Sequence, residues 1–229
     1  MRVVTTCHKA GLEQYGRRWL ESRKNWPKGT DFRFYTEGFP VDCPGKDFSD
    51  LAEFTGWKKR HLFYRPPDWR FDVVRFAHKV FAIHDALYDY DGIGVWLDAD
   101  VVTYKKIPKG LIEKQVEGVY VGHFGRTGLY TETGLVIFDC KHSQHRQFLN
   151  TWTDWYLSGR FRKGPQWHDC IGFDLALKQT GVPANNLSGE HHKSMHPLSV
   201  TELGKWLDHC KGARKELGYS PENKFRKAA

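Results

Sequence analysis

Two carboxylates follow directly after an apolar run near the middle of the chain. The run is Gly92–Leu97, and Asp98 and Asp100 come next with Ala99 between them. In open α/β sheets, ligands bind outside the carboxyl ends of the strands. Two acids at this spacing repel each other unless a cation or hydrogen-bond donors lie between them. The pattern therefore predicts a divalent metal of the kind that commonly holds phosphates; the alternative is a turn in which Asp98 caps the next segment and Asp100 is solvated.

A second group of residues suited to such a site lies near the end of the chain. His209, Gly212 and Lys215 have the form His-x-x-Gly-x-x-Lys. The His can supply a third metal ligand, the Gly allows a phosphate to approach the backbone closely, and the Lys provides a point charge for that phosphate. Alone, this segment would be interpreted as a basic tail with an incidental His. Together with the two acids, it predicts a metal and diphosphate site.

The elements that must position these residues alternate along the first hundred residues. We expect helices at Ala10–Lys24, Asp72–Tyr88, His142–Leu157 and Asp169–Thr180, and a loop over residues 38–56. Strands are expected at Arg2–Thr6, Asp31–Tyr35, Gly92–Leu97, Val119–His123 and Leu135–Asp139, with another at Lys59–Tyr64 closed by Pro66 and Pro67. Strands alternating with helices predict an α/β fold with a mainly parallel sheet.

Composition narrows the class of protein. The chain has 229 residues, which predicts a single domain, and its net charge of +8 favours an anionic partner. No apolar stretch is long enough to cross a membrane, and the first residues do not have the pattern of a signal peptide. The five Cys are too scattered for a zinc ribbon or a C-x-x-C motif, which is typical of reduced thiols in a cytoplasmic protein. Oligomeric state cannot be predicted from these features.

The two motifs, in this order and spacing, resemble the GT-A fold of nucleotide-sugar glycosyltransferases. The nearest pattern is that of family eight, the glycogenin-like and lipopolysaccharide galactosyltransferase-like enzymes. The resemblance implies that Asp98, Asp100 and His209 bind Mn²⁺ or Mg²⁺, and that Gly212 and Lys215 contact the diphosphate of a UDP-sugar. It implies one catalytic domain: residues 1–100 bind the nucleotide, 101–210 hold donor sugar and acceptor, and the basic tail 211–229 contributes to the diphosphate site.

The same resemblance assigns further residues around the donor. Thr5 and Thr6 would face the nucleotide base, and Arg75, Lys79 and Ala99 would lie near the nucleotide. The segment Tyr130–Gly134 is interpreted as a polar turn entering a strand, with Thr133 and Gly134 beside the donor sugar; an ordinary loop-to-strand junction is the alternative. Asp169 would contact the donor sugar, or would simply cap its helix. If the reaction inverts the sugar, Glu132 and Asp169 are the candidate bases; if it retains, the leaving phosphate assists the attack.

Two other features carry weaker expectations. The loop with His191, His192 and His196 has no Cys partner nearby, and a mobile polar loop that acts as a lid is favoured over a metal site. The Trp-rich stretch Trp152–Trp167 is expected to pack in the core, with a stacking platform for a sugar or base as the alternative.

The predicted function is therefore metal-dependent transfer of a sugar from a nucleotide-sugar to an acceptor hydroxyl. The expected acceptor is a glycan or modified DNA; hydroxymethylated DNA is suggested by the charge and by a similarity in size and charge to bacteriophage enzymes that glycosylate modified DNA bases. One alternative is a basic nucleic-acid-binding module without catalysis, although no helix-turn-helix, zinc-finger or RRM signature is present. Another is a nucleotidyltransferase, for which Cys7–Gly11 is a poor match to the expected Gly-rich segment.

Overall fold

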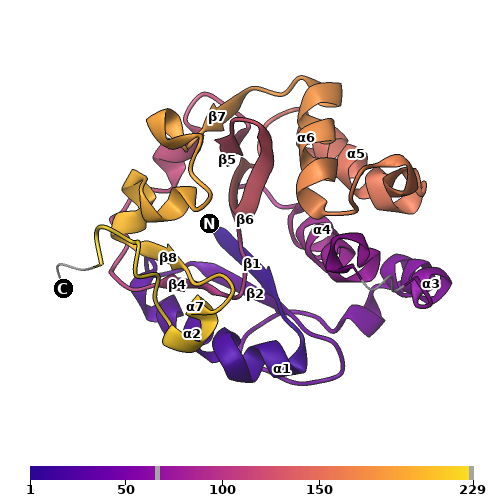
Figure 1. The fold of residues 1–229 in the computed structure, drawn as a ribbon, viewed down its shortest axis with the longest axis horizontal. Helices are drawn as coiled ribbons and strands as arrows, with labels where there is room; N and C mark the ends of the chain where they lie inside the picture. Colours follow the sequence, from indigo (N-terminus) through magenta and orange to yellow (C-terminus); the bar gives the residue numbers. More distant parts are fainter. Residues whose placement is uncertain (65–67, 227–229) are drawn as a thin grey trace.

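The computed structural model describes residues 1–64 and 68–226, and a six-stranded sheet runs through the centre of the molecule (Figure 1). Within the described residues, β6 is antiparallel to its neighbours β3 and β5, and the other pairs of this sheet are parallel, which confirms a mainly parallel sheet. Its strand order is β2 (Asp31–Tyr35), β1 (Arg2–Thr6), β3 (Ile93–Leu97), β6 (Leu129–Asp139), β5 (Val121–Arg126) and β7 (Ala184–Asn186).

Successive side chains of the central strands point to opposite faces of the sheet, and each face carries its own hydrophobic core. On one face, Val4, Trp96 and Val136 pack under the helices α3 (Ala52–His61), α4 (Val73–Leu87), α5 (His145–Leu157) and α6 (Asp169–Thr180). On the other, Val3, Val95 and Ile137 pack against the N-terminal helices and residues near the end of the chain. Figure 1 shows α3 to α6 on one side of the sheet, with α1, α2 and α7 on the other.

The segment after β1 is helical through most of its length, as the apolar spacing predicts. It consists of α1 (Lys9–Gly11), a π-helical turn (Leu12–Gly16), α2 (Arg17–Ser22) and a 3₁₀ turn (Arg23–Asn25). A second, two-stranded sheet lies beside it, formed by β4 (Val101–Thr103) and β8 (Leu207–His209) in antiparallel pairing. The last helix is the short α7 (Arg214–Leu217).

The expected strand at Lys59–Tyr64 is wrong, and the expected loop over residues 38–56 ends too late. Helix α3 begins at Ala52 and continues to His61, because Phe54, Trp57 and His61 recur at helical spacing and are all buried. The other two residues of that prediction, Pro66 and Pro67, lie outside the described residues.

The expected polar turn at Tyr130–Gly134 is also wrong. These residues form the first half of β6, which begins at Leu129. Thr131, Glu132 and Thr133 are buried there, and each is paired with polar groups from elsewhere in the chain, so polar side chains continue the strand instead of breaking it.

The Trp-rich stretch belongs to the core. Trp152, Trp155 and Trp167 are all buried, as core packing predicts. None of the helices in residues 1–64 and 68–226 has the length and apolar character needed to cross a membrane.

Candidate functional site

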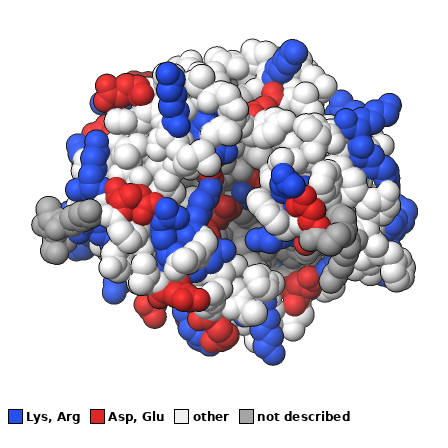
Figure 2. Space-filling model, in the orientation of Figure 1, with Lys and Arg blue, Asp and Glu red and all other residues white. Residues whose placement is uncertain are grey.

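A cleft of about 1180 Å³ opens at the edge of the sheet where β1, β3 and β5 end and β6 begins. Figure 2 shows a hollow in the middle of this face, with Lys and Arg side chains beside it and acidic side chains within. The cleft is lined by residues that follow β1 and β3, by one side of α4, by the start of β6, by the start of α6 and by the late His-x-x-Gly-x-x-Lys segment. This is the edge at which open α/β sheets bind ligands.

Asp98, Asp100 and His209 meet in this cleft, with one ligand atom from each lying within 4.8 Å of the other two. His209 Nε2 is 3.1 Å from Asp100 Oδ1 and 3.8 Å from Asp98 Oδ2. The small sheet brings them together, because Val101 is paired with His209 and the amide of Cys210 donates to the carbonyl of Asp100 at 2.9 Å. Residues more than one hundred positions apart thus become neighbours through β4 and β8.

The three side chains suit a divalent cation. Two carboxylates and one imidazole form a mixed oxygen and nitrogen set of the kind that Mn²⁺ accepts. The imidazole has little room to move, because a Cβ atom built on Gly134 would lie 2.1 Å from His209 Cε1. The carbonyl of His209 accepts from Ser220 Oγ at 3.1 Å and from His196 Nε2 at 2.7 Å. A ligand whose ring is confined and whose backbone is hydrogen-bonded is preorganised for binding.

Lys215 lies beside Asp100, with its Nζ 3.2 Å from Asp100 Oδ2. Burial raises the pKa of Asp100, but His209 and Lys215 more than offset this and hold that pKa well below its usual range. The carboxylate is therefore ionised at neutral pH and available to a cation. Gly212 lines the cleft with a left-handed φ of +57°, a conformation that turns the backbone sharply between His209 and Lys215.

Lys79 joins three segments of the cleft wall. Its Nζ is 2.9 Å from Asp98 Oδ1 and 2.9 Å from Asp169 Oδ2, and it donates to the carbonyl of Thr133 at 3.1 Å. Burial lowers the pKa of Lys79, but Asp169 and Asp98 outweigh it, so the pKa is raised and the ammonium stays charged. Thr133 Oγ1 also donates to Asp169 Oδ2 at 2.5 Å. The charge between Asp98 and Asp169 thus fixes the start of α6 against the end of β3.

Glu132 is held between two cations. It forms ion pairs with Lys211 and, at 3.7 Å, with Arg126, and its Oε1 accepts from the amide of Gly134 at 3.0 Å. Burial raises the pKa of Glu132, but Lys211 and His209 bring it down to about 2. A carboxylate with so low a pKa is a weak base near neutral pH.

The remaining predicted residues are distributed in and around the cleft. Thr6, Arg75 and Ala99 line it, and Thr6 Oγ1 donates to the carbonyl of Tyr35 at 2.9 Å. Thr5 is fully buried and is not part of the lining. Gly134 lies behind His209 instead of on the cleft surface.

Asp169 is the first residue of α6, and His168 before it occupies the N-cap position without a side-chain capping bond. The carboxylate of Asp169 contacts Lys79 and Thr133 instead of the first turn of its own helix. The structure therefore gives Asp169 a place in the cleft wall and not the role of a simple cap.

Sequence reasoning missed Lys211, Arg126 and Tyr15. Lys211 falls inside the late motif, where its charge was a signal that could have been used. Arg126 ends β5, and its meeting with Glu132 depends on the β5–β6 pairing, which no local pattern indicates. Tyr15 lies in the π-helical turn, and Lys215 Nζ is 4.4 Å from the centre of its ring.

The His-rich loop does not form a second metal site in the part of the chain that the structure describes, where the Asp98 group is the candidate. His196 is buried and supports the backbone of His209, whereas His191 belongs to a 3₁₀ turn (Gly189–His191). Its proposed action as a lid stays a prediction.

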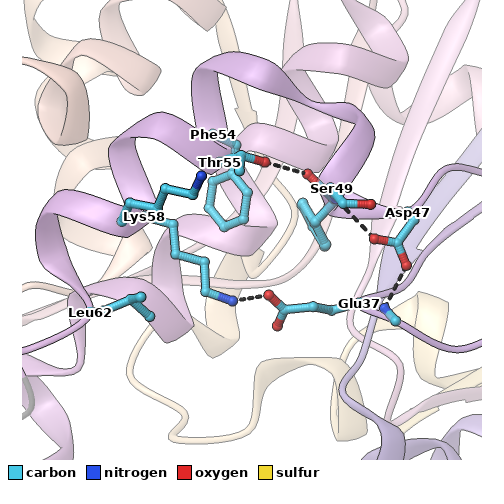
Figure 3. Close-up of a pocket in the computed structure, with 10 residues that line it drawn as sticks. Glu37, Asp47, Ser49, Phe54, Thr55, Lys58 and Leu62 are labelled. Atoms are coloured by element: carbon cyan, nitrogen blue, oxygen red, sulfur yellow. Dashed lines mark hydrogen bonds and ion pairs between the residues drawn. The ribbon is translucent and has the colours of Figure 1, made fainter.

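A smaller side pocket of about 440 Å³ lies next to the cleft, between α3 and the loop after β2 (Figure 3). Glu37, Phe48 and Lys58 line both hollows, and Glu37 forms an ion pair with Lys58. Asp47 accepts from the amides of Ser49 and Gly38, at 2.9 and 2.5 Å, which fixes the loop that forms the pocket floor.

Comparison with known proteins identifies the fold that forms the cleft. No protein-family model and no curated protein matches the sequence. Among solved structures, the chain is similar to apo mouse xyloside xylosyltransferase 1, with a TM-score of 0.53 and 12% identity over 80% of this chain and 83% of that one. At such low identity the match is evidence of the fold alone, and the fold is the GT-A fold of nucleotide-sugar glycosyltransferases.

Two other glycosyltransferase structures give the same result. The apo bifunctional glycosyltransferase WbbM matches with a TM-score of 0.52 and 11% identity over 83% of this chain and 39% of that one. The apo glycosyltransferase GlyE of Streptococcus pneumoniae TIGR4 matches with a TM-score of 0.50 and 12% identity over 82% of this chain and 45% of that one. This chain thus spans less than half the length of either.

Proposed function

We propose that this protein is a metal-dependent glycosyltransferase that moves a sugar from a UDP-sugar donor to an acceptor hydroxyl. The observation that carries the proposal is the meeting of Asp98, Asp100 and His209 beside Lys215, at the ligand-binding edge of a GT-A sheet. Two acids, an imidazole and an ammonium in one cleft suit a cation and the diphosphate that it accompanies.

Asp98, Asp100 and His209 would hold the cation, Mn²⁺ or Mg²⁺. When bound, a divalent cation supplies Lewis-acid neutralisation of the negative charge that develops on a departing diphosphate. Lys215 and the backbone at Gly212 would bind the diphosphate oxygens. Thr5, Thr6, Arg75 and Ala99 are proposed to lie around the nucleoside, as the resemblance implies; for Thr5, that role would have to act through the backbone, because its side chain is fully buried.

The middle of the cleft is proposed to hold the donor sugar. Lys79, Thr133 and Asp169 form a connected polar wall there, with hydrogen-bonding atoms that face one another at 2.5 to 3.2 Å. Gly134 supports this wall from behind. Asp169 is engaged by Lys79 and Glu132 by Lys211, so neither carboxylate is poised to accept a proton from an acceptor. These pairings favour retention, in which the leaving phosphate assists the attack.

The proposal is tested by the release of UDP. Wild-type protein with Mn²⁺ is incubated with a panel of UDP-sugars, with and without candidate acceptors that include hydroxymethylated duplex DNA. We expect Asp100→Asn to lower the rate roughly 100-fold, because a charged ligand is lost.

The matched control is Asp91→Asn. Asp91 is exposed and lies just before the start of β3, whereas Asp98 and Asp100 follow its end, so this variant should leave the rate unchanged. If no UDP-sugar is turned over in the presence of Mn²⁺, or if both variants behave alike, the proposed function is wrong.

A further inference from the structure

Three aromatic rings form a shelf in the wall of the cleft. The shelf consists of Trp69, Phe76 and His168, all of which line the cleft. The Trp69 and His168 rings are stacked, with centroids 5.1 Å apart and planes at 20°, and Phe76 packs on His168 with centroids 4.4 Å apart. Trp69 nevertheless remains 58% exposed. Trp69 therefore offers an open aromatic face inside the cleft, and aromatic side chains of this kind commonly line ligand sites.

The shelf is rigidly attached to the wall of the cleft. Trp69 begins a 3₁₀ turn that Asp68 caps by accepting from the amide of Arg70 at 3.0 Å. The carbonyl of Arg70 accepts from the amide of Trp167 at 3.0 Å, which ties this turn to the residue before His168. The aromatic surface is therefore a preformed part of the site, with little ordering to be completed on binding.

A short chain of contacts connects the shelf with the metal group. His168 is followed by Asp169, Asp169 contacts Lys79, and Lys79 contacts Asp98. The Asp98 and Lys215 end is suited to a cation and a diphosphate, and the Lys79 and Asp169 wall is suited to the donor sugar. The shelf adjoins that wall through His168 and Asp169, so a molecule placed on it would lie beside the proposed position of the donor sugar.

The charge of the cleft selects the kind of acceptor. Although the whole chain carries +8, the cleft lining contains as many Asp and Glu as Lys and Arg side chains. Beside the shelf, the guanidinium of Arg70 is bound by both oxygens of Asp68. A groove for a nucleic acid backbone needs a clear excess of positive charge. A balanced lining with one open aromatic face suits a neutral ring, whose apolar C–H face packs on the indole while its hydroxyls meet polar neighbours.

We propose that Trp69, supported by His168 and Phe76, is the acceptor subsite of this protein, and that the acceptor is an uncharged sugar. This inference rests on the proposed function, because it assigns the acceptor end of the same cleft. Of the two acceptors expected from the sequence, it favours the glycan over hydroxymethylated DNA.

The test measures transfer by wild type, Trp69→Ala and Trp69→Phe, with Phe63→Ala as a matched control. Phe63 is 98% exposed and lies six residues before Trp69 in the sequence, but it does not line the cleft. The acceptors are the neutral methyl glycosides of glucose, galactose, mannose and xylose, and hydroxymethylated duplex DNA. Hydrolysis of the donor by water, without acceptor, is measured in parallel.

We expect transfer to at least one methyl glycoside by the wild type. Trp69→Ala should lower the ratio of transfer to donor hydrolysis about tenfold or more, since loss of one aromatic stacking partner has an effect of this order. Trp69→Phe should retain part of the ratio, and Phe63→Ala all of it.

The inference is overturned if donor hydrolysis occurs but the ratio is the same in Trp69→Ala and wild type. It is equally overturned if only DNA accepts the sugar, or if a protein that hydrolyses the donor transfers to none of the glycosides. Absence of donor hydrolysis in the wild type is a different result, because it contradicts the proposed function itself.

Discussion

Gly134 is the position at which the smallest change should disturb the metal group. A Cβ atom added by Gly134→Ala would lie 2.1 Å from Cε1 and 2.5 Å from Nδ1 of His209, whereas ordinary contact begins at 3.4 Å. The ring would have to move by about 1.3 Å. Metal ligation tolerates displacements of only about 0.2 Å. We therefore expect the affinity for Mn²⁺ to fall at least about tenfold, and overpacking to lower the free energy of unfolding by about 1–3 kcal/mol.

The affinity is measured by isothermal titration of Mn²⁺ in the presence of UDP, and the stability by urea denaturation without metal. Gly56→Ala is the control, since the nearest atom to its added Cβ is the end of the Arg60 side chain at 3.7 Å. In a His209→Ala background, Gly134→Ala should cost less stability, because the ring is gone and only the contact of the added Cβ with Glu132 Oε1 at 3.0 Å remains. Unchanged Mn²⁺ affinity in Gly134→Ala, or an equal loss of stability in both backgrounds, would refute this reasoning.

Three further substitutions test other parts of the structure. Lys79→Met leaves Asp98 and Asp169 without their shared cation, so the free energy of unfolding in urea should fall by about 3 kcal/mol; a loss below 1 kcal/mol would argue against the bridge. Lys215→Ala should weaken UDP binding by about 10- to 100-fold in calorimetry, since a charged contact to the diphosphate is lost; equal affinity would remove Lys215 from the site. Burial lowers the pKa of His123 from 6.5 to about 4, so the stability that its neutral ring contributes is present above pH 6.5 and lost as pH falls toward 4. Between pH 6.5 and 4, the free energy of unfolding of His123→Phe, measured in urea, should therefore fall by ~3 kcal/mol less than that of the wild type. If the free energies of the two proteins change in parallel with pH, the assignment is wrong.

The sequence predicted those parts of the molecule whose signals are local. The apolar run into Asp98 and Asp100 marks the end of β3, and the N-terminal boundary of α6 at Asp169 was expected correctly. The meeting of His209 with the two acids is not local, since it depends on the pairing of β4 with β8. It was expected from the resemblance to glycosyltransferases, which supplied the long-range information that residue spacing lacks.

The errors also have physical causes. Charged residues at Lys58, Lys59 and Arg60 obscured the helical spacing of α3, because its apolar residues are few and aromatic. In β6, Glu132 looked like part of a turn because its partner Lys211 comes from a distant segment. A buried polar residue is compatible with a strand only when such a partner exists, and the partner is a property of the fold.

Asp98, Asp100 and His209 are proposed to hold a cation that in turn holds a diphosphate. The most direct measurement is the electron–nuclear double resonance spectrum of the protein with Mn²⁺ and UDP, using ¹⁵N-histidine. We expect ³¹P couplings from the diphosphate together with coupling to one imidazole nitrogen, and His209→Ala should abolish the nitrogen coupling. Mn²⁺ without ³¹P coupling, or a nitrogen coupling that persists in His209→Ala, would contradict it.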